Sequence, residues 1–409
     1  MIKFNYFKNL LKTHSSLLII ILGAGCFFIS NIIFKTVLND INYGIYSLIV
    51  TYFSLIYVYG ILGFEQVFLR YSFVTKKGII QTPRINLIII ILVSLLTSIL
   101  YYTVFNSFYL KSYSNILLYF ASYCLIISMP IFSILRLKGL FEIAQLIANY
   151  WKFILLIISI YFLFFKIDSI VSLINILCFL IIGCTAIIIL NTIKQFKFCY
   201  TSSINKKTIL KSFLFFFISI TSFSIITFGD RFIIEQKNGL EAVGIYFFLS
   251  NFLIAPYGIL QNYIGFKQLV KYKEGIELNT LFKNVYLSLL LGVILGSFLL
   301  MIIFFIEEFN ILTFKFFKYK YEMFLLIILG ITRLYSAVIS PAFEVSTNLK
   351  MLKYFNIILI ISTILIITTL IFLNSVSINI VLLSLIFLWF IRTFAQHLLI
   401  LKNKAFYNE

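Results

Sequence analysis

The sequence predicts an all-α protein that crosses a membrane many times. Of its 409 residues, 62% are hydrophobic and only 11% are charged, and a soluble globular protein does not have this balance. Apolar runs recur along the chain, and each is long enough to cross a hydrocarbon core of about 30 Å as a helix. Only helices and closed barrels satisfy their backbone hydrogen bonds in lipid, and continuous apolar runs indicate helices.

We expect a polytopic protein with twelve transmembrane helices, separated by short polar or basic segments. The first run follows several lysines, but it is long for a signal peptide and no clear cleavage pattern ends it, so we expect it to be retained. We place the helices at residues 15–34, 44–63, 85–105, 116–135, 143–165, 170–192, 212–229, 240–263, 284–306, 322–343, 354–373 and 378–400.

Segments near the start of the chain recur about two hundred residues later. Leu10-Leu11-Lys12-Thr13 and Gly44-Ile45-Tyr46 are echoed by Ile209-Leu210-Lys211-Ser212 and Gly244-Ile245-Tyr246. Further echoes are Gly63-Phe64-Glu65-Gln66 with Gly265-Phe266-Lys267-Gln268, and Ile127-Ser128-Met129-Pro130 with Ile339-Ser340-Pro341. Repeated halves of this kind are typical of transporters that rock one half against the other.

The repeat predicts an N-terminal six-helix bundle at residues 1–200 and a C-terminal six-helix bundle at residues 201–409. An even number of crossings gives both halves the same orientation, which predicts two parallel repeats around a central cavity. Because both halves of the transport path lie in one chain, we expect a monomer.

Lysine and arginine are distributed unevenly between the two sides of the predicted membrane. Most of the 33 Lys and Arg residues lie at the termini or in the loops after the even-numbered helices, as Lys76, Lys77, Lys194 and Lys197 do. Both termini are therefore expected in the cytoplasm. The same bias accounts for most of the net charge of +19, so the charge does not indicate nucleic-acid binding.

The sequence lacks signatures of a metal site, a cofactor or an enzyme. Cys26, Cys124, Cys178 and Cys184 lie within predicted helices, which favours free thiols. No Walker loop, dinucleotide fingerprint or nucleophile–base motif is present. We therefore expect no cofactor and no metal, and we expect movement of a substrate rather than chemistry on it.

Several segments resemble the bacterial O-antigen and capsular polysaccharide flippases (polysaccharide biosynthesis proteins). The stretch Leu38-Asn39-Asp40-Ile41-Asn42-Tyr43-Gly44-Ile45-Tyr46 is similar to the opening of that family, and Gly229-Asp230-Arg231-Phe232-Ile233-Ile234 is similar to its seventh helix. The family belongs to the multidrug, oligosaccharidyl-lipid and polysaccharide exporter superfamily. Its layout of six plus six helices matches the layout predicted for the whole chain.

The resemblance implies a flippase of the bacterial inner membrane. Such a protein moves an undecaprenyl-diphosphate-linked oligosaccharide from the cytoplasmic to the outer leaflet by alternating access. The implied partners are this polyprenyl-diphosphate-linked glycan, membrane lipids, and a polysaccharide polymerase with its chain-length regulator. A hydrated glycan cannot cross hydrocarbon unaided, and its diphosphate would favour cationic side chains in the path.

Three basic residues lie at membrane depth: Lys152, Arg333 and Arg392. Each costs roughly 2.5 to 3.5 kcal/mol at the bilayer centre, so each is expected to face a cavity or a partner. We expect Arg333, helped by Lys152 and Arg392, to bind the lipid diphosphate. The alternative is that these side chains snorkel or fix helix packing.

Two charged pairs are candidate gating contacts, and three prolines are candidate hinges. Glu65 with Arg70 at the cytoplasmic end of the second helix, and Asp230 with Arg231 at the external end of the seventh, are candidate gating contacts. The alternative is local capping or pairing, worth under about 1 kcal/mol when exposed. The candidate hinges are the prolines inside predicted helices, Pro130, Pro256 and Pro341. The alternative is that these prolines produce static kinks.

Three other functions compete with this prediction. A multidrug or organic-cation antiporter of the same superfamily would need an acidic residue deep in a helix, whereas the deep residues identified above are basic. A lipid II flippase usually has two further helices. A membrane-embedded glycan polymerase or acyltransferase would need larger external loops than this chain provides.

Overall fold

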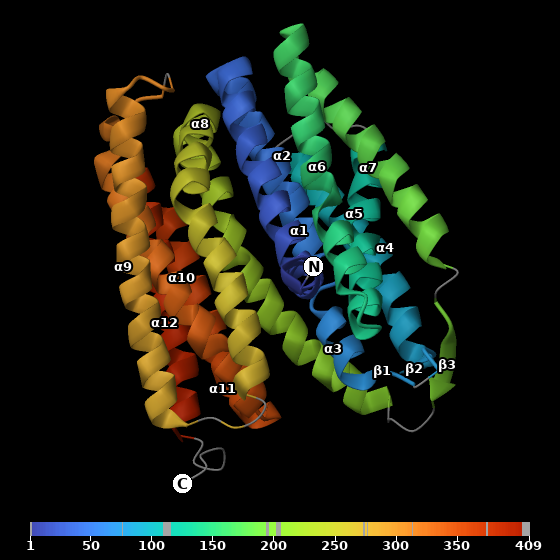
Figure 1. Cartoon of the computed structure of the whole chain (residues 1–409). Helices are drawn as coiled ribbons and strands as arrows, with labels where there is room; N and C mark the ends of the chain where they lie inside the picture. The colour runs from blue at the N-terminus through green and yellow to red at the C-terminus, as the bar shows by residue number, and fades with distance from the viewer. Residues whose placement is uncertain are drawn as a thin grey trace. The chain divides into compact units, whose positions relative to one another are not determined.

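The fold is described from a computed structural model of the chain (Figure 1). It describes residues 2–75, 77–108, 116–193, 196–201, 206–272, 275, 277–312, 314–373 and 375–402, with side chains except at 2–14, 17, 201, 266, 269, 270 and 349. Lys76 and Lys194, assigned above to the cytoplasmic side, lie outside the described residues. Apart from one small sheet, the regular structure is helical.

The chain forms two compact units, Met1–Thr221 and Ser222–Glu409. The division falls inside a helix rather than at a loop near residue 200. The start of that helix belongs to the first unit because Ile209 is fully buried in a cluster with Phe64 and Phe68. The elements of the first unit are α1 (Ile2–Val37), α2 (Asp40–Tyr59), α3 (Phe64–Tyr71), β1 (Phe73–Val74), β2 (Ile80–Pro83), α4 (Arg84–Phe108), α5 (Ile116–Leu137), α6 (Phe141–Phe165), α7 (Ile170–Thr192), β3 (Phe198–Thr201) and the start of α8 (Lys206–Tyr272).

Helix α5 lies at the centre of the first unit, where it contacts α2, α4, α6 and α7. Helix α1 packs along α6, and Phe27 on α1 meets Trp151 on α6 edge to face at 5.8 Å. Most of α2 is buried. A helix buried on nearly all sides within a membrane protein contacts other helices rather than lipid, so α2 belongs to the interior of this unit.

A small sheet ties the connection between the sequence halves to the first unit. Its strand order is β1-β2-β3, with β1 antiparallel and β3 parallel to β2. Ile80 and Thr82 on the central strand are fully buried, and Ser72 Oγ donates a hydrogen bond to Thr82 Oγ1 at 2.7 Å. The strand β3, which precedes α8, is therefore held in the first unit by its pairing with β2.

The sheet can be tested with a native cysteine. Gln81 on β2 is the direct partner of Cys199 on β3, and directly paired residues lie at a separation that suits a disulfide. We expect Gln81→Cys to form a disulfide with Cys199 under mild oxidation, detected as a loss of free thiols by mass spectrometry. The Cys199→Ser background should abolish the cross-link, and absence of any cross-link in the Gln81→Cys protein would contradict the register.

The second unit contains the remainder of α8 and the four helices that follow. Helix α10 is its centre and contacts α9 and α12, while α11 packs on α12. The elements are α9 (Leu278–Glu308), the short 3-10 helix η2 (Phe316–Tyr319), α10 (Lys320–Ser346), α11 (Leu349–Phe372) and α12 (Ile378–Lys402).

Helix α8 is folded back on itself at Gly239. Its 67 residues are helical except at Gly239, where φ is 84° and ψ is 177°, a conformation that essentially only glycine adopts. Tyr246 after the break donates a hydrogen bond to Asp230 before it. Sixteen residues of straight helix would span about 24 Å, so this contact requires the chain to reverse direction.

Helix packing in the second unit depends on glycines around Tyr257. The fully buried ring of Tyr257 fills the space beside Gly330 on α10, and its hydroxyl donates to the Gly292 carbonyl on α9 at 2.8 Å. A Cβ added to Gly330 would lie 2.4 Å from Tyr257 Cδ2. The close approach of the three helices therefore requires that position 330 has no side chain.

We expect Gly330→Ala to lower the thermal stability of the purified protein and its abundance in membranes. Overpacking of this kind costs about 1–3 kcal/mol. The matched control is Gly258→Ala, where an added Cβ meets nothing within 4 Å. Equal melting temperatures for the two variants, measured by a thermal-shift assay in detergent, would contradict the packing described here.

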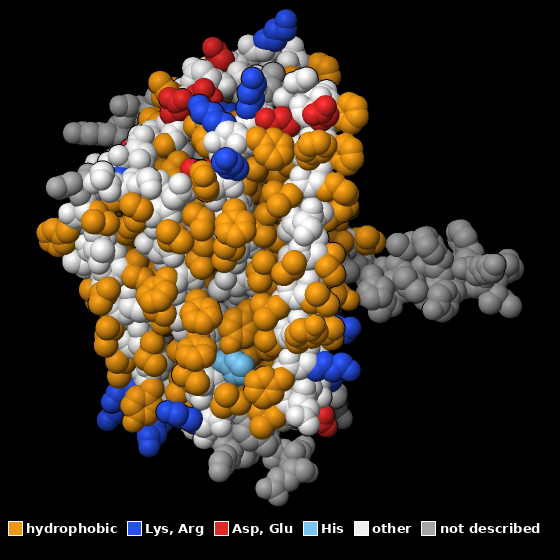
Figure 2. Space-filling model, turned by 90° about the vertical axis from the view of Figure 1, so that its left-hand side faces the viewer, with side chains coloured by type: hydrophobic (Ala, Val, Ile, Leu, Met, Phe, Trp, Pro, Cys, Tyr) orange, Lys and Arg blue, Asp and Glu red, His pale blue; other side chains and the backbone are white. Residues whose placement is uncertain are grey.

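The surface and the helix lengths define the class of protein. Figure 2 shows one face on which hydrophobic side chains cover the middle, while charged side chains gather toward the two ends. Among the described residues, eleven helices are long and apolar enough to cross a membrane. The protein is a helical multi-pass membrane protein, and the longest of these helices is the folded α8.

Candidate functional site

The structure brings Arg333 and Arg392 together in the second unit, around one tryptophan. The Arg333 guanidinium on α10 lies 5.1 Å from the ring centroid of Trp389 on α12, and that of Arg392 lies 5.4 Å from the same centroid. Arg392 also lies 4.2 Å from the ring centroid of Phe223 on α8. Trp389 is 2% exposed, so both cations contact an aromatic ring in the interior.

The aromatic contacts offset much of the cost of placing the two arginines at membrane depth. A desolvated cation–π contact contributes about 2 kcal/mol, against roughly 2.5 to 3.5 kcal/mol for placing an arginine at the bilayer centre. Hydrogen bonds contribute further, because Arg392 Nη1 donates to Ser336 Oγ at 2.9 Å. We call Arg333, Arg392, Trp389, Phe223 and Ser336 the arginine–tryptophan cluster.

A row of polar side chains continues from this cluster between α10 and α12. Ser336 Oγ lies 3.0 Å from Ser340 Oγ, and Ser340 Oγ donates to Gln396 Oε1 at 2.9 Å. Ser336 and Gln396 are buried. Buried polar groups that bond to one another cost little to desolvate, so the row extends a polar interior along two helices of the unit.

Lys152 lies in the other unit and is held locally. Its Nζ donates to Asn149 Oδ1 at 2.8 Å on the same helix, α6. Asn149 is 3% exposed and packs against Gly23 of α1, where an added Cβ would lie 2.5 Å from Asn149 Oδ1. Lys152 is therefore part of a contact between α1 and α6, and the contacts described here do not include it in the arginine–tryptophan cluster.

Asp230 and Arg231 do not lie at the end of a helix, which corrects the position predicted from the sequence. The helix continues to Gly239, so both residues lie inside it. Asp230 is 6% exposed and accepts a hydrogen bond from Tyr246, while Arg231 lies 4.7 Å from the ring centroid of Phe247. The charges are accommodated in a helix because the returning half of α8 supplies their contacts. Their gating role stays a prediction.

Glu65 and Arg70 lie on the short helix α3, which is separate from the second transmembrane helix. That helix ends at Tyr59, and the turn before α3 contains Gly63 with φ 79°. Five helical positions place Glu65 and Arg70 on different sides of α3. Glu65 is buried and Arg70 is exposed, so the structure does not support local pairing, and a gating role for either residue stays a prediction.

The three prolines lie inside helices that continue through them. Pro130 lies in α5 and Pro341 in α10, the central helices of the two units, and Pro256 lies in α8. Pro130 and Pro341 are buried. Their matching places in the two units agree with the sequence repeat, and their use as hinges stays a prediction.

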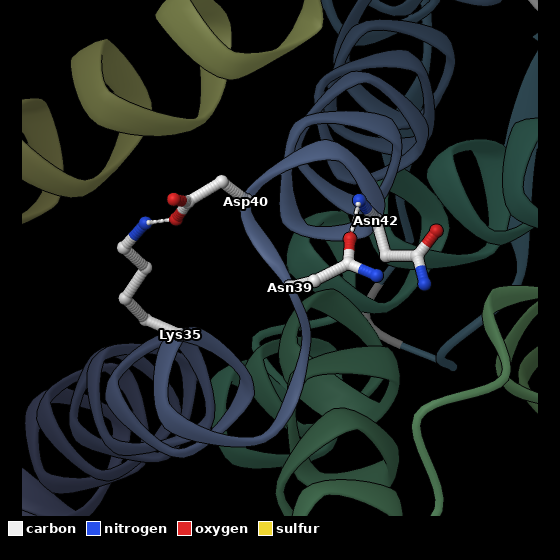
Figure 3. Close-up of polar contacts among 4 residues, drawn as sticks. All are labelled: Lys35, Asn39, Asp40 and Asn42. Carbon is white, nitrogen blue, oxygen red and sulfur yellow. Dashed lines mark hydrogen bonds and ion pairs between the residues drawn. The ribbon is translucent and has the colours of Figure 1, made fainter.

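The turn between α1 and α2, which carries part of the family resemblance, is closed by polar contacts (Figure 3). Asn39 caps α2 by accepting a hydrogen bond from the Asn42 backbone N–H at 2.8 Å. Lys35 Nζ and Asp40 Oδ1 form an ion pair at 2.5 Å. Asn42 Nδ2 donates to the carbonyl of Asp168 at 3.1 Å. These residues stabilise the start of α2 and the turn before it, and Asn39 does so as an N-cap.

Several side chains of the site were not identified from the sequence. Trp389 and Ser336 lie on transmembrane helices among many apolar and small residues, and no spacing distinguishes them. Tyr246 stands in the repeated Gly-Ile-Tyr segment, and that repetition was the available signal.

Comparison with known proteins adds no assignment to this geometry. No family model matches the chain, and no curated protein and no solved structure matches it. The function is therefore inferred from the cluster itself.

Proposed function

We propose that this protein is a flippase that moves a polyprenyl-diphosphate-linked oligosaccharide from the cytoplasmic to the outer leaflet. The observation that supports it best is the arginine–tryptophan cluster, in which two guanidinium groups share one buried ring. Arginine suits this role because its planar donors bind phosphate oxygens in pairs and because it stacks on aromatic rings. The polyprenyl chain would stay in lipid while the diphosphate enters the protein.

The proposal includes an arrangement of twelve crossings in two parallel repeats in a bacterial inner membrane, with both termini cytoplasmic. The fold of α8 at Gly239 supports it, because each arm of that helix is long enough to cross by itself. The uneven placement of Lys and Arg supports the orientation.

The buried carboxylate of Asp230 is the observation within the second unit that favours an organic-cation antiporter. Such a protein needs an acidic group at membrane depth to meet its substrate. Here Tyr246 donates a hydrogen bond to Asp230 Oδ2, and Arg231 is the next residue along the helix. Arg231 balances the negative charge of Asp230, which disfavours a cationic substrate at this carboxylate.

Deletion of the gene tests the flippase proposal. Lipid-linked glycans would be analysed in separated membrane leaflets, with complementation by the wild-type gene. We expect complete polyprenyl-linked oligosaccharide to accumulate on the cytoplasmic face. A normal distribution with unpolymerised units outside would indicate a polymerase or transferase, and increased sensitivity to cationic dyes without any glycan change would indicate the antiporter.

A further inference from the structure

A groove of about 310 Å³ runs along α12 in the second unit. Its lining comes from α12, between Phe387 and Lys402, and from Ile358 of α11, the helix that packs on α12. Ligand-binding pockets in proteins have volumes of about 300 to 1,000 Å³. The groove is therefore large enough to hold part of a small molecule.

Exposed apolar side chains line most of this groove. Phe387, Phe390 and Phe394 are all exposed, and the rings of Phe390 and Phe394 stack with their centroids 5.6 Å apart. At helical spacing these residues form one stripe along α12, which continues through Leu398 to Lys402. From Phe387 to Lys402 the stripe measures about 22 Å, and one leaflet is half of a hydrocarbon core about 30 Å thick. The stripe is long enough to follow a lipid chain through one leaflet.

The groove ends at a group of cations. Lys402 lines it, and Lys350 and Lys353 are exposed in the first turns of α11. Both helices are long enough to cross a membrane and a short connection joins them, so the start of α11 lies on the same side as Lys402. Neither helix contains Asp or Glu. This end of the groove is therefore positively charged at the depth of lipid head groups.

The groove is separate from the arginine–tryptophan cluster. Trp389 and Arg392 of α12 belong to that cluster, whereas Phe390 and Phe394 line the groove. With 3.6 residues per turn, the two sets point to nearly opposite sides of α12. Trp389 is buried and Phe390 is exposed, in agreement with this arrangement. A molecule in the groove would contact the lipid-facing side of the helix.

We propose that this groove binds an anionic phospholipid of the leaflet on the side of Lys402, with one acyl chain along the phenylalanine stripe and the phosphate at the lysines. Basic pockets beside transmembrane helices bind anionic lipid head groups in this way. An undecaprenyl chain suits the groove less well, because it is much longer than an acyl chain and the groove follows one leaflet. The inference does not depend on the proposed function.

The charge arm of the test measures lipid binding to the purified full chain by native mass spectrometry. The probes are phosphatidylglycerol and phosphatidylcholine with the same acyl chains, and we expect phosphatidylglycerol to bind about tenfold more tightly or better. Lys402→Gln should raise the Kd for phosphatidylglycerol about fivefold, the effect of one lysine beside an anionic lipid, and leave that for phosphatidylcholine unchanged. The matched control, Lys320→Gln, removes an exposed lysine at the start of α10 and should change neither Kd.

The chain arm of the test fills the groove. Leu398 lines it and is exposed, so Leu398→Trp places a larger ring in the groove without overpacking the core. We expect both lipids to bind about tenfold more weakly, because the acyl chain loses its contact with the stripe. The matched control is Leu383→Trp, at an exposed position of α12 that precedes the residues lining the groove, and it should bind both lipids like the wild-type protein.

Several outcomes would overturn the proposal. They include equal affinities of the wild-type protein for the two lipids, and a Lys402→Gln or Leu398→Trp protein that binds phosphatidylglycerol as its control does. Displacement of bound phosphatidylglycerol by an equal concentration of undecaprenyl phosphate would assign the groove to the proposed substrate. A lipid-free dimer that Leu398→Trp dissociates would assign it to a second copy of the chain. The variants leave the arginine–tryptophan cluster intact, so glycan export tests the proposed function separately.

Discussion

Replacing Arg333 by alanine is expected to abolish glycan export per molecule of protein. The variant loses a guanidinium that shares the ring of buried Trp389 with Arg392. Loss of one partner from a desolvated charged contact costs about 2–5 kcal/mol, which is roughly thirtyfold or more in affinity. Arg333→Lys keeps the charge but loses the planar pair of donors, so we expect intermediate export.

The measurement for Arg333 is the amount of lipid-linked glycan in each leaflet of a complemented deletion strain, divided by the amount of protein in the membrane. Lys283→Ala is the matched control, because Lys283 is an exposed cation in the first turns of α9, a helix that contributes no residue to the cluster. Export at the wild-type level from Arg333→Ala, with the control also normal, would show that this arginine has only a structural role or none.

Replacing Gly239 by alanine is expected to have the second large effect. Residue 239 has φ 84° and ψ 177°, where a side chain costs about 1–3 kcal/mol. The cost is not local, because the reversal at this residue places Tyr246 against Asp230 and Phe247 against Arg231. We expect a lower melting temperature, lower abundance in membranes and loss of export.

The control for Gly239 is another glycine of α8. Gly229 has ordinary helical geometry, and an added Cβ would make only an ordinary contact of 3.5 Å with Ile225. Gly229→Ala should therefore match or slightly exceed the wild-type stability, since alanine favours helix. The melting temperatures of both variants are compared in detergent, and a Gly239→Ala protein as stable as Gly229→Ala would argue against the folded α8.

Most of the helices could be predicted from the sequence. The helix predicted at 170–192 is α7, and the one predicted at 378–400 ends two residues early. A run of about twenty apolar residues is stable in lipid only as a helix, whatever its neighbours are. The ends of the helices were predicted less well. A helix can continue through polar residues where other elements of the fold supply contacts for their side chains. This occurs at Asp230 and Arg231 in α8, and the second helix ended early at Tyr59.

The candidate site was predicted in part. Arg333 and Arg392 were identified because cations are rare and costly at membrane depth. Trp389, Ser336 and Tyr246 were not identified, because aromatic and hydroxyl side chains are common in transmembrane helices and carry no comparable cost.

By itself the sequence determined that this is a helical multi-pass membrane protein with a few basic residues inside its apolar runs, and its echoed segments predict two related halves. These properties follow from the composition of short sequence segments and from repetition along the chain. Neither requires knowledge of which residues are in contact in the folded protein. The tertiary structure alone decided that Arg333 and Arg392 meet at Trp389 and that Asp230 meets Tyr246. Those contacts depend on the rotation of each helix about its axis and on where α8 reverses, and both are set by packing among residues distant in the chain.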